Sequence, residues 1–135
     1  MPRYMLDTNT VSYIIKGQPA GVRERLQRVA MEQVCISVIT EAELLLGLAQ
    51  KPAATRLAEI VSQFLLRVEI LSWDSPAAKA YARFASDTFA PGKPLSALDM
   101  LIASHALSAG ATLVTSDRSF YRLKRRPSLI DWTKR

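Results

Sequence analysis

The stretch YMLDTNTVSYIIKG, residues 4–17, joins a short apolar run to a segment with helical spacing. The run Tyr4–Leu6 is typical of a strand buried on both faces. After it, apolar residues recur at the i, i+3, i+4 interval of a helix: Val11, Ile14 and Ile15. Asp7 therefore follows the carboxyl end of a strand. At that edge of an open α/β sheet, an acidic residue either caps the next helix or contributes to a ligand site.

Strand-like and helix-like segments alternate along the rest of the chain. Further runs typical of strands lie at residues 33–37, 67–73, 111–117 and 128–132. Helical periodicity is found between them, at residues 8–16, 18–30, 38–50, 52–66, 74–90 and 95–110, and residues 90–94 form a predicted loop. The sequence places Pro52 at the start of one helix, Asp74 or Ser75 at the cap of the next, and Gly110 at the end of the last. This alternation predicts an α/β fold in layers around a mostly parallel sheet of four to five strands.

The bulk properties predict one cytoplasmic domain that covers residues 1–135. No linker or internal repeat divides the chain, and no apolar stretch approaches the ~18 residues that a membrane span requires. No apolar segment with a cleavage site follows the amino terminus. The net charge of +6 favours a polyanionic partner such as RNA.

Cysteine and histidine each occur once, as Cys35 and His105. These counts exclude a disulfide within the chain, a zinc cluster of cysteine and histidine, and a ribonuclease that uses two histidines as acid and base. Both residues lie in apolar segments and are predicted to have packing roles. Any catalysis must therefore use carboxylates.

Four acidic residues stand out by position. Asp7 and Asp117 each follow a predicted strand, so both are expected at the same edge of a parallel sheet. Asp99 and Glu43 lie in mostly apolar helices, although periodicity alone does not choose between Glu43 and Glu41.

Each acid has an ordinary structural explanation when it is taken singly. Asp7 and Asp117 could be helix caps, Asp99 a first-turn acid favoured by the helix dipole, and Glu43 a solvated residue. Taken together, clustered carboxylates repel one another unless a hard cation such as Mg²⁺ or Mn²⁺ lies between them. Such an ion promotes the hydrolysis of phosphodiesters.

Five segments, in this order, resemble the PIN-domain ribonucleases and in particular the VapC toxins of bacterial type II toxin–antitoxin systems. They are MLDTNTVSYIIKG (5–17), ISVITEAELLLG (36–47), PLSALDMLIASHAL (94–107), ATLVTSD (111–117) and LIDW (129–132). The resemblance covers nearly the whole chain. It implies a PIN-like three-layer α/β/α fold.

The resemblance also implies which residues form the site. It makes the four acids catalytic and metal-binding: Asp7, Glu43, Asp99 and Asp117. The family pattern T-x-A-E-L selects Glu43 over Glu41. Polar groups that support the acids are implied at Asn9 and Thr115, and at Ser116, where many relatives have asparagine.

The implied activity is a Mg²⁺- or Mn²⁺-dependent endoribonuclease toxin. Members of this family are usually homodimers held inactive by a cognate VapB-type antitoxin, and relatives with similar motifs cut tRNA, which makes tRNA the expected substrate. In this scheme Asp7 and Asp99 hold the ion, and Glu43 and Asp117 complete its shell directly or through water. Basic residues near the carboxyl terminus are expected to bind flanking phosphates: Arg118, Arg122, Lys124, Arg125 and Arg126.

Two other interpretations stay open from the sequence. A non-catalytic module would bind RNA or protein by charge, and replacement of Asp99 would leave its activity and binding unaffected. A phosphohydrolase of the haloacid dehalogenase type would use Asp7 as nucleophile, but Asn9 stands where that class needs its second acid.

Overall fold

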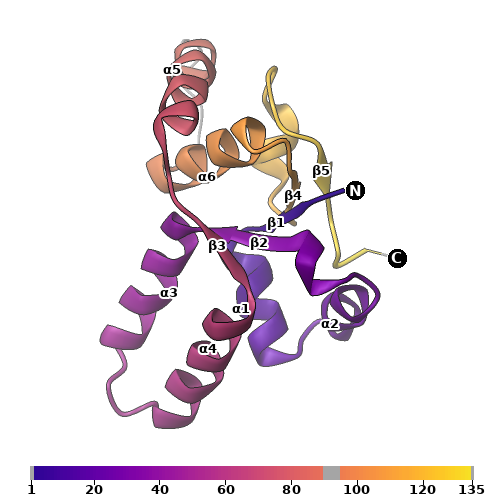
Figure 1. Cartoon of the computed structure of the whole chain (residues 1–135), viewed down its shortest axis with the longest axis vertical. Coiled ribbons are helices and arrows are strands. Elements are labelled where there is room, and N and C mark those ends of the chain that lie inside the picture. The colour runs from indigo at the N-terminus through magenta and orange to yellow at the C-terminus, as the bar shows by residue number, and fades with distance from the viewer. Residues whose placement is uncertain (1, 90–94, 135) are drawn as a thin grey trace.

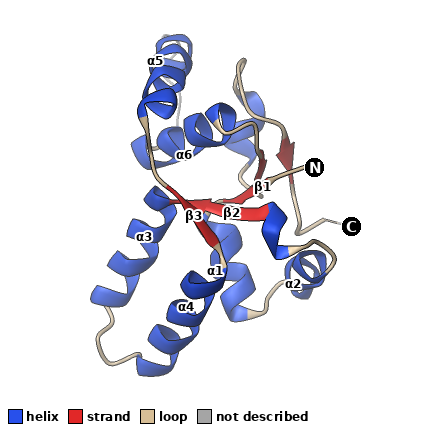
Figure 2. Ribbon diagram, in the orientation of Figure 1, coloured by secondary structure: helices blue, strands red, loops and turns tan. Residues whose placement is uncertain are grey.

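The computed structural model describes residues 2–89 and 95–134. Its strands are β1 (Tyr4–Leu6), β2 (Val34–Ser37), β3 (Glu69–Leu71), β4 (Thr112–Val114) and β5 (Leu129–Ile130). Its α-helices are α1 (Thr8–Lys16), α2 (Ala20–Gln27), α3 (Val38–Ala49), α4 (Thr55–Arg67), α5 (Ser75–Phe89) and α6 (Ala97–Ser108). Two 3₁₀ helices, η1 (Met31–Gln33) and η2 (Arg118–Arg122), complete the described elements (Figure 2).

The five strands form one parallel sheet in the order β3-β2-β1-β4-β5. From β1 the chain moves outward through β2 to β3, and it then returns to the other side of β1 to add β4 and β5. The direction of winding therefore changes between β1 and β4. In sheets of this type, ligands bind beyond the carboxyl ends of the strands at such a switch point.

Helices cover both faces of the sheet, as the fold prediction requires (Figure 1). Successive residues of each strand point to opposite faces. One face packs Met5, Cys35 and Leu113 against α5, α6 and η2. The other face packs Leu6, Ile36 and Val114 against α1 to α4 and Trp132. The predicted three-layer α/β/α architecture is therefore confirmed, and Figure 1 shows α5 and α6 on one side of the sheet with α1 to α4 on the other.

Helix boundaries differ from the sequence prediction at one proline. Pro52 does not open α4, which begins three residues later at Thr55, because Pro52 and Ala53 form a turn closed by a hydrogen bond from the Ala54 N–H to the Lys51 carbonyl (3.0 Å). Asp74 caps α5 as predicted, since its carboxylate accepts a hydrogen bond from the Ala77 N–H (3.1 Å). The predicted loop at residues 90–94 lies outside the described residues.

The predicted end of the last long helix at Gly110 is confirmed. Gly110 has a φ of +65°, which residues with a side chain rarely adopt, and α6 ends two residues before it. In the part of the chain that the structure describes, no helix is both long and apolar enough to cross a membrane.

The single histidine joins α6 to the β2–α3 junction. His105 is buried, and its Nδ1 lies 2.8 Å from the hydroxyl of Ser37, which also caps α3 by accepting a hydrogen bond from the Ile39 N–H (3.1 Å). Burial lowers the pKa of His105, while the Asp74 carboxylate and the Ser72 backbone partly oppose that shift. The predicted packing role of His105 agrees with this position.

The pKa of His105 gives the fold an acid sensitivity. The unfolded chain takes up a proton as pH falls through about 6.5, whereas the folded chain resists protonation until a lower pH. We expect the free energy of unfolding to fall over this window in wild type and to fall less in His105→Asn. Urea unfolding of both proteins at pH 7.5 and pH 5.5 measures the difference, and equal losses in the two proteins would contradict it.

The apolar side chains in the middle of the central strands are fully buried, so truncation there is costly. Leu113 on β4 is fully buried, and Leu113→Ala should lower the free energy of unfolding by about 3 kcal/mol. Leu66 on α4 is 79% exposed, so Leu66→Ala should cost less than about 0.5 kcal/mol. Urea denaturation of the two variants compares the costs, and similar values would show that the layers do not pack as described.

Candidate functional site

Asp7 lies at the switch point between β1 and β4. Its backbone N–H donates to the Val114 carbonyl (3.1 Å), and its Oδ1 accepts a hydrogen bond from the Thr10 N–H (2.8 Å) at the start of α1. The Thr10 hydroxyl donates to the same Val114 carbonyl (3.0 Å), which ties α1 to β4. Asp7 is only 4% exposed. It is therefore a helix cap, as one of the two sequence interpretations held, but it is also a buried carboxyl group at the ligand-binding edge.

Asp117 reaches the same edge from the end of β4. Its Oδ1 caps η2 by accepting a hydrogen bond from the Ser119 N–H (2.9 Å), and its own N–H donates to the Thr115 hydroxyl (3.1 Å). The buried Thr115 hydroxyl also interacts with Asp7, since it lowers the pKa of that carboxyl group. Thr115 thus connects the two acids that follow neighbouring strands, which agrees with its predicted supporting role.

Glu43 faces this edge from α3. Its Oε1 accepts a hydrogen bond from the hydroxyl of Thr8 (2.6 Å), the first residue of α1, and the same hydroxyl lies 3.3 Å from the Thr40 hydroxyl. Helix α3 therefore places Glu43 against Thr8, the residue that directly follows Asp7 in the chain. No such contact between Glu41 and the acids is described within residues 2–89 and 95–134, so the geometry favours Glu43 over Glu41.

Asp99 completes the group from the first turn of α6. Ser96 caps this helix by accepting a hydrogen bond from the Asp99 N–H (3.1 Å), which fixes the turn that carries the carboxylate. Asp99 is half-buried, and its charge interacts with those of Glu43, Asp117 and Asp7. The structure therefore brings together all four acids that the sequence singled out.

Burial and neighbouring acids raise the pKa of Asp7 and of Asp99. Burial is the main cause of the raised pKa of Asp7, which hydrogen bonds from Thr115 and Thr10 oppose and the charge of Asp117 increases. Burial is also the main cause of the raised pKa of Asp99, which Ser96 opposes and the three other acids increase. Asp7 and Asp99 are therefore harder to ionise than an ordinary aspartate.

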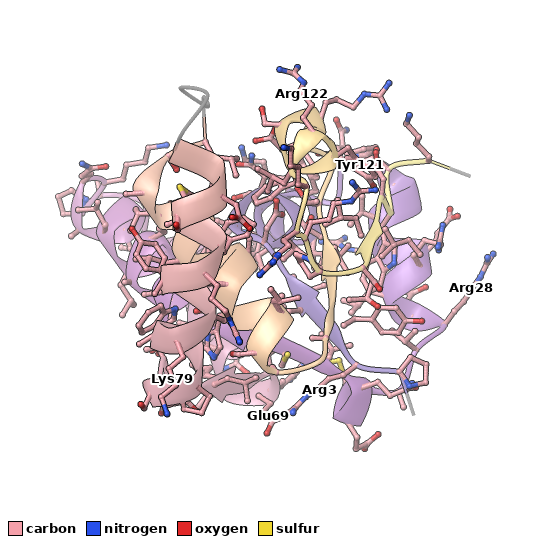
Figure 3. All side chains as sticks on the ribbon, turned by 90° about the horizontal axis from the view of Figure 1, so that it is seen from above. Arg3, Arg28, Glu69, Lys79, Tyr121 and Arg122 are labelled. Atoms are coloured by element: carbon pink, nitrogen blue, oxygen red, sulfur yellow. The ribbon has the colours of Figure 1, made fainter. Side chains whose placement is uncertain are left out.

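No cationic side chain among the described residues forms an ion pair with these acids. Among the described residues, the ion pairs are Arg3–Glu69, visible side by side in Figure 3, and Arg125–Asp87, and neither includes a site acid. Four carboxylates supply the hard oxygen donors that Mg²⁺ and Mn²⁺ prefer, so the donor set fits such an ion.

The acids are nevertheless spread around the edge. Within residues 2–89 and 95–134, no three acidic, histidine or cysteine side chains converge closely enough to enclose an ion. Mg²⁺ commonly keeps several of its waters and uses one or two protein carboxylates, so an open arrangement of this kind suits it better than a closed cage would.

Asn9 and Ser116, the other two predicted supporting residues, have no described side-chain hydrogen bond to a site acid. Asn9 is exposed on the first turn of α1, and Ser116 is half-buried between Thr115 and Asp117. In the first motif, the hydroxyl of Thr8 contacts Glu43 and the backbone N–H of Thr10 contacts Asp7. Sequence reasoning missed both residues, and it also missed Ser96. The signal for Ser96 was available, because a serine three residues before an acid is a common helix start.

The five predicted phosphate-binding residues fall into two groups. Arg118 follows Asp117 directly, and Arg122 points away from the body of the molecule (Figure 3). Lys124, Arg125 and Arg126 instead line a hollow with α5 and the last turns of α6. Leu107 in that hollow lies eight residues after Asp99, about 12 Å along α6.

Two of these basic side chains have contacts within the protein. The Arg125 guanidinium pairs with Asp87 (3.3 Å). That of Arg126 donates to the carbonyls of Tyr121 (3.1 Å) and Leu123 (3.2 Å) and lies over the Tyr121 ring. These contacts hold the segment that follows η2 in place.

The raised pKa of Asp99 predicts that the site destabilises the fold at neutral pH. The folded chain binds the Asp99 proton more tightly than the unfolded chain, so stability is lost as pH rises from about 3.8 through the folded pKa. We expect Asp99→Asn to raise Tm by a few degrees at pH 7 in EDTA, with the gain vanishing near pH 3.5. Thermal unfolding at both pH values measures this, and a lower Tm for the variant at pH 7 would contradict it.

Similarity to known proteins confirms the family resemblance seen in the sequence. A family model described as the PIN domain matches residues 4–126. The tRNA(fMet)-specific endonuclease VapC of Salmonella typhimurium is 36% identical over 124 residues, which cover 91% of this chain and 93% of that protein.

Solved structures show the same similarity. A chain of DNA-bound VapBC from Salmonella typhimurium has a TM-score of 0.88 at 35% identity and covers 98% of this chain and 99% of its own. A chain of VapBC2 from Rickettsia felis, bound to a DNA fragment from its promoter, has a TM-score of 0.86 at 30% identity, with 96% and 98% covered. With its acids at the switch point of a parallel sheet, the chain belongs to the PIN-domain family and is a relative of the VapC ribonucleases.

Proposed function

We propose that this protein is a Mg²⁺- or Mn²⁺-dependent endoribonuclease toxin that hydrolyses tRNA. The observation that carries the proposal is the placement of four interacting carboxylates along one edge of the sheet, without a compensating cation among the described residues: Asp7, Glu43, Asp99 and Asp117. A protein with a net charge of +6 attracts RNA, but these acids repel phosphate unless an ion lies between them. A divalent ion resolves that conflict.

The four acids fall into two pairs with different roles in the proposed site. Asp7 and Asp99 hold the ion, since both are partly desolvated and have raised pKa values that a cation would lower. Glu43 and Asp117 complete the shell directly or through water. A bound ion of this kind polarises a phosphoryl oxygen and lowers the pKa of water for attack on phosphorus.

Hydroxyl groups orient these carboxylates. Thr115 fixes Asp7 and Asp117 relative to each other, and Thr8 directs Glu43 toward the edge through its 2.6 Å hydrogen bond. Such partners hold acidic ligands in a productive orientation and commonly affect metal affinity when they are removed. The alternative hypothesis of a non-catalytic binding module does not explain why hydroxyl groups hold four carboxylates near one another.

The comparisons support the substrate and the partners. The Salmonella relative is named for cleavage of tRNA(fMet), and the similar solved structures are VapBC complexes. We therefore assign this chain a tRNA substrate and a VapB-type antitoxin as partner. A homodimer, which the family implies, is supported by the apolar side chains that α3 exposes, Leu45 at 48% and Leu46 at 57%.

Cleavage of total tRNA by purified protein, freed of any co-purifying partner, tests the proposal. We expect discrete fragments with Mg²⁺ or Mn²⁺, none with EDTA, and at least a 100-fold loss of rate in Asp99→Asn, because one ligand oxygen is replaced by an amide. Mg²⁺ should also raise the Tm of wild type more than that of the variant.

The exposed acid Glu32 provides a matched control. Glu32→Gln removes the same charge on η1, directly before β2 and so at the opposite ends of the parallel strands from the site, and should cut tRNA at the wild-type rate. If Asp99→Asn cuts as fast as Glu32→Gln, the four acids do not form the catalytic site.

A further inference from the structure

A groove leads away from the acidic edge between α1 and the α3–α4 pair. Its volume is about 270 Å³. Thr8 and Glu43, which the proposed function places at the site, line one end, and Lys16 and Lys51 line the other. The groove is therefore continuous with the acids at one end and positively charged at the other.

The two helices set the length of this groove. Lys16 lies eight residues after Thr8 on α1, and Lys51 lies eight residues after Glu43, just beyond the end of α3. Eight helical residues rise about 12 Å, so both lysines stand at about the same distance from the site. The walls between the two ends carry hydroxyl and apolar groups, among them Ser12, Ile15 and Leu57.

Neither lysine serves the fold through an ion pair. Both side chains are exposed, and the ion pairs within residues 2–89 and 95–134 involve other residues. Their charges are therefore available to a ligand. By contrast, Arg125 forms an ion pair with Asp87, and Arg126 donates hydrogen bonds to backbone carbonyls.

Gly47 keeps the groove open along α3. It lines the groove one turn after Glu43, and a Cβ placed on it would have no atom within 4 Å. Glycine within a helix is unfavourable, and no close packing explains it here. Any longer side chain at this position would project into the groove.

We infer that this groove binds one strand of the RNA substrate next to the bond that is cut, with its phosphates on Lys16 and Lys51. The inference rests on the proposed function, because it takes Glu43 as the end of the groove where the reaction occurs. The two lysines at one end of the groove favour a polyanion as its occupant. A single extended strand with a charged backbone and flat bases matches both the lysines and the apolar walls.

Salt-dependent binding tests the two lysines. The probe is a fluorescein-labelled, mixed-sequence 20-nucleotide RNA, bound in EDTA to proteins that carry Asp99→Asn so that no cleavage occurs. Log K falls as log salt rises, and each phosphate contact on a single strand adds about 0.7 to the steepness of that fall. Lys16→Gln/Lys51→Gln should therefore reduce the magnitude of the slope by about 1.4.

A variant with the same loss of net charge is the control for this measurement. Arg28→Gln/Lys79→Gln removes two positive charges on other faces of the molecule (Figure 3) and should leave the slope within about 0.3 of the parent. An equal slope in the two double variants overturns the inference, and so does a loss in the control alone.

Gly47→Gln tests the open wall without changing charge. This variant should keep or raise Tm, because glutamine is the better helix former, and should raise KM for tRNA cleavage about tenfold while kcat changes little. Ala49→Gln places the same side chain on an exposed position of α3 outside the groove and should leave KM unchanged. Unchanged KM in a folded Gly47→Gln protein contradicts the inference.

The two proposals fail in different ways. If wild type cuts no RNA, the proposed function fails, but the salt slope still reports whether Lys16 and Lys51 contact phosphates. If wild type cuts tRNA and the groove variants match their controls in slope and KM, the groove assignment fails and the nuclease assignment stands.

Discussion

The pairing of one three-residue strand on both of its sides holds the molecule together. β1 forms parallel ladders with β2 and with β4, so both halves of the sheet are attached to Tyr4–Leu6. Its residues alternate between the two cores, with Met5 in one and Leu6 in the other. The next residue, Asp7, therefore has little freedom, because the buried strand before it and the capped helix after it fix its position.

Holding Asp7 in this buried position lowers the stability of the fold. A buried carboxyl group with three acids nearby is unfavourable, and the raised pKa values of Asp7 and Asp99 report it. The fold offsets part of this cost through hydroxyl and backbone donors, from Thr10, Thr115 and Ser96, and not through cationic side chains among the described residues. Neutral donors orient the acids without cancelling their negative charge. Functional sites commonly trade stability in this way.

The sequence predicted the strands and helices well because their apolar residues repeat with the period of each element. Tyr4–Leu6 follows this rule. Helix ends depend instead on capping residues: Asp74 was predicted correctly as a cap, whereas Pro52 was wrongly placed at a helix start, since a proline fits a turn as well as the first turn of a helix. The four acids were found from strand ends and the family resemblance. Thr8, Gly47 and the two groove lysines were not found, because their roles arise from the way α1 packs beside α3, and no local pattern encodes that packing.

The strand order also determines when a growing chain can become complete. Asp7 emerges early in synthesis, but the β4 strand that pairs with β1 comes more than 100 residues later, and Asp117 comes after it. Contacts between residues so far apart form late and slowly in folding. A chain that ended before residue 112 would lack β4, β5 and Asp117. It would leave one side of β1 unpaired and the acidic edge incomplete, so the site depends on synthesis of nearly the whole chain.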